Sequence, residues 1–425
     1  MLNAETQLTT YGYLKTENVR KNERSLLSAD MLLFVLLWPL IILPKELQFI
    51  MLFTVAVFLL KKYKVRLDLL SFFLFGYIML YTFSILINLA IRTPEVIRIV
   101  AAFNSLSIWV LAVLFYLIFK TVKLDLKKFV KIGFVNYSIL ICLWVVSVLV
   151  HSITSISEVS LLTRTLYYNE TFNQQVVTRF VGFLDYSNLI VLFCLFFYPL
   201  YFLHIRHFKY KIVQVLFLVI GILPLISSYS RSGYLVFGAA LAIAAFYYIY
   251  QSTNRNVFYF FSFLSLAVLI AVFFITNVHF VLFEKVEELM TARQGSNDSR
   301  EIILAESINV TTRQSPIVGM GIKDYSSAGY PLGSHSTILG FFYKTGIFGL
   351  LIGTWIFIYI NFKILFSKRS LERKFLSVFL FLMPFIFFVE DVDGANWLIC
   401  MYFIFVAILL NDKNWTSIKK SMPLQ

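Results

Sequence analysis

The chain has 425 residues, of which 59% are hydrophobic and 14% are charged. Soluble domains are typically about 25% charged, so this composition excludes a soluble globular protein and indicates an integral membrane protein. The net charge of +14 does not indicate nucleic-acid binding, because the basic residues form short clusters between apolar runs, as the positive-inside rule predicts. The three cysteines, Cys142, Cys194 and Cys400, lie in apolar runs without metal-ligand spacing, so neither disulfide bonds nor a zinc site is expected.

Apolar runs of membrane-spanning length recur along the whole chain. A run of about 17–25 apolar residues is long enough to cross the hydrocarbon core as a helix. The sequence therefore predicts an all-α polytopic membrane protein with about twelve transmembrane helices. We expect no cleavable signal peptide, because the first apolar run lacks a small-residue cleavage site. The expected helices cover residues 29–44, 46–60, 68–91, 98–119, 132–151, 185–203, 212–227, 233–250, 257–277, 336–360, 375–390 and 396–411.

Lysine and arginine are unevenly distributed over the connections between these helices. Most lie in the N-terminal tail and in alternate short connections, which the positive-inside rule places in the cytoplasm. Both termini are therefore expected in the cytoplasm, with residues 1–28 as a cytoplasmic tail. The long connections on the opposite side, residues 152–184 and 278–335, are expected to be extracytoplasmic active-site loops with short helices. No repeat or linker divides the chain, so residues 1–425 are taken as a single domain.

The second long loop contains the pattern of a helix start. After Phe283–Met290, a stretch compatible with a helix on the membrane surface, Asp298 can cap a helix and Glu301 can complete a capping box. Arg300 would then lie in the first turn, where the helix dipole disfavours a cation unless an anion such as phosphate binds there. The alternative is an exposed arginine that pairs with Glu301 or Glu306.

A single histidine follows this helix among glycine, serine and threonine residues. The helix is expected to end near Thr312, before a glycine-rich turn at residues 315–321. His335 then lies at the membrane boundary, and an imidazole that titrates near neutral pH is suited to general base catalysis. A purely structural role is the alternative for a lone histidine.

Three other cations lie beside or within the predicted membrane helices. Arg179 ends the first long loop, where the alternative is an interfacial arginine that reaches toward water. Arg231 lies in a very short outer turn, where a cation is costly unless it is paired or serves a water-filled cavity; binding of lipid headgroups is the alternative. Lys344 lies within an apolar run, where it can extend to the membrane surface or contribute positive potential.

Three carboxylates, Glu390, Asp391 and Asp393, cluster on the last outer turn. They could bind a sugar or orient an arginine, and the simplest expectation is that they are solvated. Without a histidine or a second acidic cluster they do not indicate a metal site. The sequence has no Walker A loop, no Gly-x-Ser-x-Gly elbow and no haem or zinc spacing.

Several short motifs follow one another in a set order. They are Arg-Phe-Val-Gly at 179–182 followed by Asn188, Ser-Arg-Ser-Gly at 230–233, Asp-Ser-Arg-Glu at 298–301, Ser-Pro-Ile-Val-Gly-Met-Gly at 315–321, Ser-His-Ser at 334–336 and Gly-Ile-Phe-Gly at 346–349. In their order, spacing and outward topology these motifs resemble the O-antigen ligase and Wzy-type polymerase superfamily of bacterial membrane glycosyltransferases.

The resemblance implies a glycan donor on undecaprenyl pyrophosphate and no metal, nucleotide or other cofactor. It makes His335 the base that deprotonates the acceptor hydroxyl, Arg179 and Arg300 the clamps on the pyrophosphate, and Arg231 a nearby helper. Direct attack at the anomeric carbon would invert its configuration. Auxiliary roles are expected for Asn188, Asp298, Lys344, Glu390 and Asp391.

The chain departs from the family pattern at two positions. Family members commonly have Ser-His-Asn, whereas Ser336 follows His335 here and preserves a small hydrogen-bonding group. Glutamate commonly precedes the glycine that opens the last motif, whereas this chain has Thr345. Because the threonine removes a carboxylate that could orient the histidine, either Glu390 or Asp391 takes this role or the base is less assisted.

The expected function is polymerisation of a bacterial surface polysaccharide, such as O-antigen or capsule, by transfer of a glycan from undecaprenyl pyrophosphate to the non-reducing end of another lipid-linked repeat unit. The alternative is a ligase that transfers the glycan to a lipid, protein or wall acceptor. A lipid-linked oligosaccharide flippase ranks behind both. It predicts pseudo-repeated halves and charges at the membrane midplane, whereas the polar residues here cluster in unequal outer loops.

We expect a bacterial inner membrane protein whose site faces the periplasm or cell exterior. Its expected partners are the lipid-linked donor and acceptor, the bilayer, a chain-length regulator and a flippase, without nucleic acid.

Overall fold

The computed structural model describes residues 28–172, 175–252, 294–366 and 370–414. Most of the expected tail, the expected span at 257–277 and the expected surface helix at Phe283–Met290 lie outside the described residues. The described helices are η1 (Ala29–Met31), α2 (Leu32–Val35), α3 (Leu37–Ile42), α4 (Lys45–Lys62), α5 (Leu69–Ile91), α6 (Val96–Phe119), α7 (Leu126–Thr154), α8 (Leu189–Ile205), α9 (Lys211–Ile226), α10 (Arg231–Ser252), α13 (Gln294–Gln314), α14 (Thr337–Phe366), α15 (Leu371–Phe387), η2 (Val392–Gly394), α16 (Asn396–Leu410) and η3 (Asp412–Asn414).

Within the described ranges, α5, α6, α7 and α14 are long and apolar enough to span a membrane. The helices α8, α9 and α16 are apolar but shorter. Apolar runs form helices in a bilayer because a helix satisfies its own backbone N–H and C=O groups without water. The chain is therefore a helical membrane protein, as its composition predicts. The number of twelve spans and the sidedness of the connections stay predictions.

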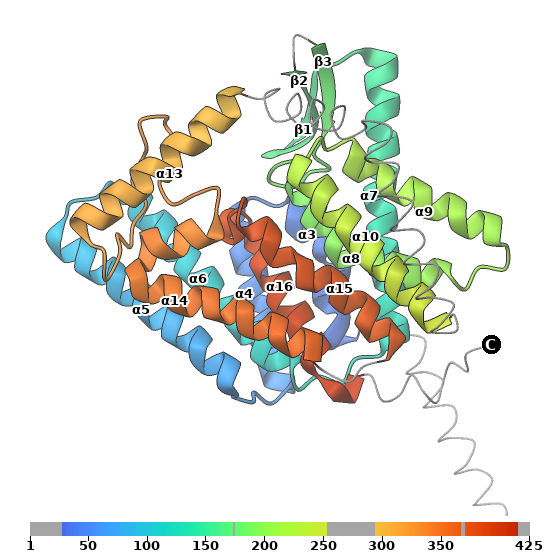
Figure 1. The fold of residues 1–425 in the computed structure, drawn as a ribbon, viewed down its shortest axis with the longest axis horizontal. Coiled ribbons are helices and arrows are strands. Elements are labelled where there is room, and N and C mark those ends of the chain that lie inside the picture. Colours follow the sequence, from blue (N-terminus) through green and yellow to red (C-terminus); the bar gives the residue numbers. More distant parts are fainter. Residues whose placement is uncertain (1–27, 173–174, 253–293, 367–369, 415–425) are drawn as a thin grey trace, which may run out of the picture.

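The core of the bundle is built around α8 and α16. Every residue of α16 from Asn396 to Leu409 is buried, and α8 is buried along almost its whole length. A helix that is apolar on every side belongs inside a bundle. Helix α16 packs against α6 and α8 packs against α7, and Figure 1 shows α16 in the middle of the bundle beside α15. This buried pair of helices sets the positions of Asn188 before α8 and of the acidic turn before α16.

The expected first helix at 29–44 is divided into three short helices. Helix α2 ends at Val35, and α3 begins at Leu37 and contains Pro39. Proline lacks a backbone N–H and its ring clashes with the carbonyl four residues earlier, which is the carbonyl of Val35. The break therefore lies where Pro39 prevents a continuous helix.

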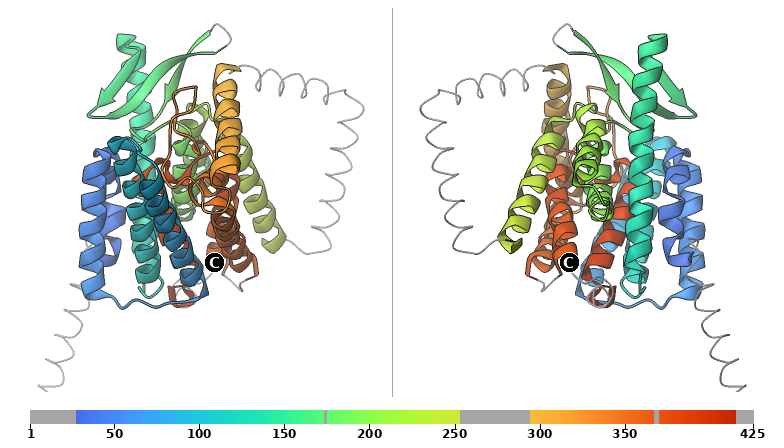
Figure 2. Two further views of the ribbon diagram at one scale, coloured as in Figure 1. Left: turned by 90° about the vertical axis from the view of Figure 1, so that its left-hand side faces the viewer. Right: turned by 90° about the vertical axis from the view of Figure 1, so that its right-hand side faces the viewer.

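The first long loop contains a sheet, so the prediction of short helices is wrong there. Strands β1 (Glu158–Leu161), β2 (Arg164–Phe172) and β3 (Gln175–Phe180) form an antiparallel sheet in the order β1-β2-β3. The strands are rich in valine, threonine, tyrosine and phenylalanine, which favour extended backbone. Figure 2 shows this sheet and α13 at the same end of the bundle. The described parts of the two long loops therefore meet at one end of the molecule.

Helix α13 begins earlier than the capping pattern predicts. It already includes Gln294, so Asp298 lies inside the helix and does not cap it, and Arg300 lies beyond the first turn. Because residues 294–297 are already helical, Asp298 has no free N-terminal amides beside it for its side chain to cap. The helix end is close to the expected one, at Gln314.

Helix α14 is kinked at Gly346, where the backbone has φ +63° and ψ −160°. The kink breaks the regular helical hydrogen bonds and exposes two carbonyls to the glycine-rich turn. The amide of Met320 donates to the Tyr343 carbonyl at 2.7 Å, and the amide of Gly321 donates to the Lys344 carbonyl at 3.0 Å. The turn therefore replaces the missing helical donors and fastens the kink.

Close contact between the turn and the kink requires glycine at position 319. Gly319 has φ +80°, and a Cβ there would lie 2.4 Å from the backbone nitrogens of both Thr345 and Gly346. From α5, the side-chain amide of Asn88 donates to the Gly319 carbonyl at 3.1 Å. These contacts hold the start of the segment that leads to His335.

We predict that Gly319→Ala destabilises the protein more than Gly329→Ala. Both glycines have a left-handed backbone, φ +80° and φ +78°, but a Cβ at Gly329 would meet nothing within 4 Å. Gly329→Ala should therefore cost only the backbone strain, about 1–2 kcal/mol, whereas Gly319→Ala adds overpacking of about 1–3 kcal/mol. Thermal unfolding of the full chain in detergent checks this order, and equal melting temperatures would contradict it.

Candidate active site

Arg179 lies on β3 and points into a set of polar groups. Its Nε donates to the Ser228 carbonyl at 2.8 Å, and its Nη1 donates to the Tyr168 hydroxyl and the Glu170 carboxylate, both at 3.1 Å. Its Nη2 donates to the side-chain carbonyl of Asn188 at 2.9 Å. The register of β2 and β3 places Tyr168 opposite Arg179, so the sheet itself positions the guanidinium. Only 5% of this arginine is exposed.

Asn188 and Glu390 connect Arg179 to the second long loop. The Asn188 amide donates to Glu390 Oε1 at 2.6 Å. The same oxygen lies 3.3 Å from Nη2 of Arg300 on α13. Two arginines from the two long loops therefore belong to one continuous chain of side chains, Arg179–Asn188–Glu390–Arg300, which we call the arginine bridge.

The last two members of the arginine bridge, Glu390 and Arg300, differ in exposure. Glu390 is 2% exposed, whereas 36% of the Arg300 side chain is exposed. Burial raises the pKa of the Glu390 carboxyl, and the charge of Arg300 and the hydrogen bond from Asn188 offset this rise only in part. A buried carboxylate needs such partners, because an unpaired buried charge is very costly. Glu390 thus holds Arg300 by one edge while the rest of this arginine is within reach of an external anion.

The backbone of His335 has φ +62°, a conformation that costs a non-glycine residue about 1–2 kcal/mol. Hydrogen bonds on both sides hold it. The Gly333 amide donates to the Ser307 hydroxyl on α13 at 2.8 Å, and the Thr337 hydroxyl donates to the Glu390 backbone carbonyl at 2.9 Å. His335 is therefore fastened both to α13 and to the turn that carries Glu390.

The surroundings of the His335 ring favour the neutral imidazole. Burial lowers its pKa, the charges of Arg300 and Lys323 lower it further, and the charge of Asp391 opposes this change. None of the described residues forms a hydrogen bond with the ring. Of the two acids expected to orient His335, Glu390 contacts Arg300 instead, and Asp391 acts on the imidazole through its charge.

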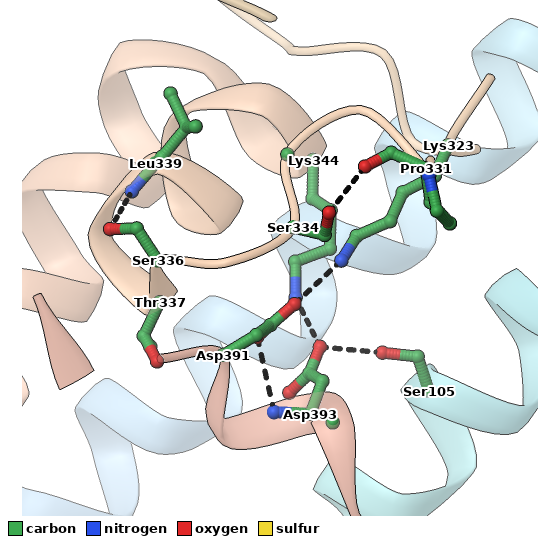
Figure 3. A network of polar contacts seen from close by, with 12 residues as sticks. Ser105, Lys323, Pro331, Ser334, Ser336, Thr337, Leu339, Lys344, Asp391 and Asp393 are labelled. Atoms are coloured by element: carbon green, nitrogen blue, oxygen red, sulfur yellow. Dashed lines mark hydrogen bonds and ion pairs between the residues drawn. The ribbon is translucent and has the colours of Figure 1, made fainter. Parts of the chain in front are cut away.

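The acidic turn after α15 is buried, so the expectation of solvated carboxylates is wrong. Asp391 Oδ2 lies 2.7 Å from Lys323 Nζ, and Asp391 Oδ1 accepts a hydrogen bond from the Asp393 amide at 3.1 Å. Asp393 pairs with Lys344 and accepts a hydrogen bond from the Ser105 hydroxyl at 2.7 Å. Figure 3 shows these contacts converging on the turn. The carboxylates are buried because two lysines from separate segments neutralise them.

Lys344 lies inside α14 and does not extend to the membrane surface. It is almost fully buried, and its ammonium lies between Asp393 and the ring of Tyr81, 5.4 Å from the ring centroid. The Trp109 indole also donates to Asp393, at 2.7 Å. Lys344 therefore stabilises the acidic turn. The neighbouring Thr345 hydroxyl donates to a carbonyl within α14.

Two other expected site residues lie at the margin of the arginine bridge. Arg231 is the first residue of α10, and it follows the turn whose Ser228 carbonyl binds Arg179. Asp298 is exposed on α13, and among the described residues it forms no hydrogen bond or ion pair with Arg300 or Glu390. The structure thus places Arg231 next to the turn that contacts Arg179 but leaves Asp298 outside the bridge.

The sequence analysis missed Lys323 and the sheet residues Tyr168 and Glu170. Lys323 follows the glycine-rich turn, and as a lysine in the loop before His335 it could have been paired with the acidic turn. Tyr168 and Glu170 alternate on β2 in the period-two pattern of one strand face, which would have indicated a common partner if the loop had been predicted as a sheet.

Residues 216–354 match the model of the O-antigen ligase family. The match confirms the resemblance to the O-antigen ligase and Wzy-type superfamily, and it covers about a third of the chain, including Arg231, Arg300 and His335. A comparison with curated proteins gives no match. Arg179, Asn188 and Glu390 lie outside the matched segment, and the tertiary structure joins them to it.

We predict that His335 is neutral at a lower pH than an ordinary histidine, because burial and Arg300 disfavour its charged form. Diethyl pyrocarbonate acylates the neutral imidazole, so the pH midpoint of acylation at His335, followed by mass spectrometry, should lie below 6.5. Lys323→Gln removes a cation and should raise this midpoint, whereas Asp391→Asn removes the opposing anion and should lower it. A midpoint above 6.5, or shifts of the same sign in both variants, would contradict the assignment.

Proposed function

We propose that the protein polymerises a bacterial surface polysaccharide, transferring a glycan from undecaprenyl pyrophosphate to the non-reducing end of another lipid-linked repeat unit. The O-antigen ligase match supports a membrane glycosyltransferase function of this general type. The observation that carries the proposal is the arginine bridge, which joins Arg179 and Arg300 from the two long loops beside His335. The single domain, the outward-facing site and the inner-membrane location are parts of the same proposal.

Arg300 is the residue we assign to the pyrophosphate. Its fork of N–H donors matches phosphate oxygens and its charge cannot be lost, and it is the more exposed of the two arginines. Arg179 is a buried second cation that holds Asn188 and adds positive potential to the same place. Arg231 follows the turn whose Ser228 carbonyl binds Arg179, and it is assigned as a helper. Together they stabilise the negative charge that develops on the leaving group, which is commonly a large contribution to catalysis.

His335 is the residue we assign as general base. The acceptor hydroxyl oxygen forms a bond to the anomeric carbon of the donor while its proton passes to the imidazole. The bond between the anomeric carbon and the pyrophosphate oxygen breaks, and undecaprenyl pyrophosphate leaves with the electron pair. A neutral imidazole can accept this proton, and the lowered pKa of His335 supplies that form at neutral pH. Attack opposite to the leaving group inverts the anomeric configuration.

A ligase is the second candidate function, because the matched family model is described as O-antigen ligase. The donor, the arginines and the base would be the same, and the acceptor would be a lipid, protein or wall component. A chain-length regulator and a flippase are further expected partners.

We predict that His335→Ala reduces transfer by about 10²–10⁴-fold, the usual contribution of general base catalysis. Arg300→Lys should reduce it by about 10²-fold, the effect of removing one charge-stabilising donor, since lysine keeps the charge but loses the fork. Arg313→Lys on the exposed last turn of α13 is the matched control and should keep full activity. The assay is transfer by the purified full chain from synthetic lipid-pyrophosphate oligosaccharide, without nucleotide or added metal. Wild-type rates in His335→Ala would exclude the assigned base.

Offering two acceptors together separates polymerase from ligase. We predict that the protein, given the lipid-pyrophosphate repeat unit and a lipid core acceptor in equal amounts, forms a ladder of lipid-linked oligomers. Gel electrophoresis and mass spectrometry distinguish this ladder from glycan attached to the core. Transfer to the core without any ladder would replace the polymerase proposal by the ligase.

A further inference from the structure

Next to His335 lies a short hairpin, residues 324–332, that the mechanism above does not use. The Leu332 amide donates to the Asp324 carbonyl at 2.8 Å, and the Ser326 amide donates to the Tyr330 carbonyl at 2.7 Å. These bonds close the hairpin across the bridge between Tyr325 and Pro331. The hairpin therefore has a defined shape although it carries little regular secondary structure.

The hairpin is fastened at its tip and at its base to α13. At the tip, the Ser327 amide donates to Glu306 at 2.9 Å and the Ser327 hydroxyl donates to the same carboxylate. At the base, the Gly333 amide donates to the Ser307 hydroxyl at 2.8 Å. Arg300, which is assigned to bind the pyrophosphate, also lies on α13. The hairpin and Arg300 are therefore held at a fixed distance from each other.

Tyr330 presents an aromatic ring beside the assigned base. Its ring centroid lies 6.0 Å from that of His335, with 72° between the ring planes, and 49% of the residue is exposed. Tyr325 of the same hairpin is similarly exposed, at 51%, but its ring packs under the guanidinium of Arg98 at 4.6 Å. The two tyrosines thus have different neighbours, and only Tyr330 contacts His335.

We propose that the ring of Tyr330 is a stacking platform for the sugar of the acceptor whose hydroxyl His335 deprotonates. This inference rests on the proposed function, because it places the acceptor at the base. A pyranose ring has an apolar face of C–H groups, and such a face packs favourably on the electron-rich face of an aromatic ring. A platform beside the imidazole holds the attacking hydroxyl near the base and limits its orientation, which is how positioning lowers a barrier. The ligand class is therefore a neutral sugar ring of the acceptor glycan.

The proposal is tested with the full chain in detergent and three variants. Tyr330→Ala removes the platform, Tyr330→Phe keeps the aromatic face, and Tyr325→Ala is the matched control in the same hairpin. We expect Tyr330→Ala to raise the acceptor KM about tenfold, the upper end of a single aromatic contact, with the donor KM unchanged. Tyr330→Phe and Tyr325→Ala should both stay within about twofold of wild type.

Two results would overturn the platform. One is an acceptor KM in Tyr330→Ala equal to that of wild type. The other is an equal rise in Tyr325→Ala, which would mean that the tyrosines only support the hairpin or anchor it at the membrane surface.

A binding measurement separates this inference from the proposed function. Single repeat-unit oligosaccharides, prepared by partial acid hydrolysis of the source strain's own surface polysaccharide, are titrated by saturation-transfer NMR. The platform is supported if wild type and Tyr325→Ala bind the oligosaccharides equally and Tyr330→Ala binds them about tenfold more weakly. If this result is obtained but no transfer is detected, only the proposed function fails. If the affinity of Tyr330→Ala equals that of wild type, the platform fails whatever the enzyme transfers.

Discussion

The candidate site depends on one buried carboxylate. Glu390 accepts hydrogen bonds from Asn188 and Arg300, and Asn188 in turn accepts one from Arg179. Because a buried anion is stable only with partners, Glu390 requires Asn188 and Arg300, and Asn188 connects it to Arg179. The sheet, the start of α8, helix α13 and the acidic turn are thereby drawn to one place, although they are far apart in the sequence. Without this constraint the two long loops would have no common centre.

The ion pairs around the acidic turn fix its position and affect the charge of His335. Lys323 pairs with Asp391 and Lys344 pairs with Asp393, so the turn is neutralised from two directions. Charged groups inside a membrane protein face the bundle interior and pair with one another. The turn is thereby fixed against both α14 and the loop before His335. It also sets the electrostatic environment of the imidazole, in which Lys323 and Asp391 act in opposite directions.

The glycine-rich motifs have a structural explanation. Gly346 kinks α14, and Gly319 allows the preceding turn to approach the kink closely enough for backbone hydrogen bonding. Glycine has no Cβ, so it can adopt the left-handed backbone conformation that such contacts need. These residues therefore act on the site indirectly, since they determine where the segment leading to His335 begins. The hairpin at 324–332 continues this segment and is held by hydrogen bonds to α13. These contacts fix the position of His335, which follows the hairpin.

The sequence by itself determined the membrane class, the ranges of most described helices, the family resemblance and the choice of Arg179, Arg300 and His335 as candidate site residues. Apolar run length and charge distribution carry this information locally. The tertiary structure alone decided that the first long loop is a sheet, that Asp298 lies within a helix, and that the acidic residues are buried and paired. It also decided that Glu390 contacts Arg300 rather than the ring of His335. These features depend on which distant segments pack together, and partners brought together by packing leave no pattern within a single stretch of sequence.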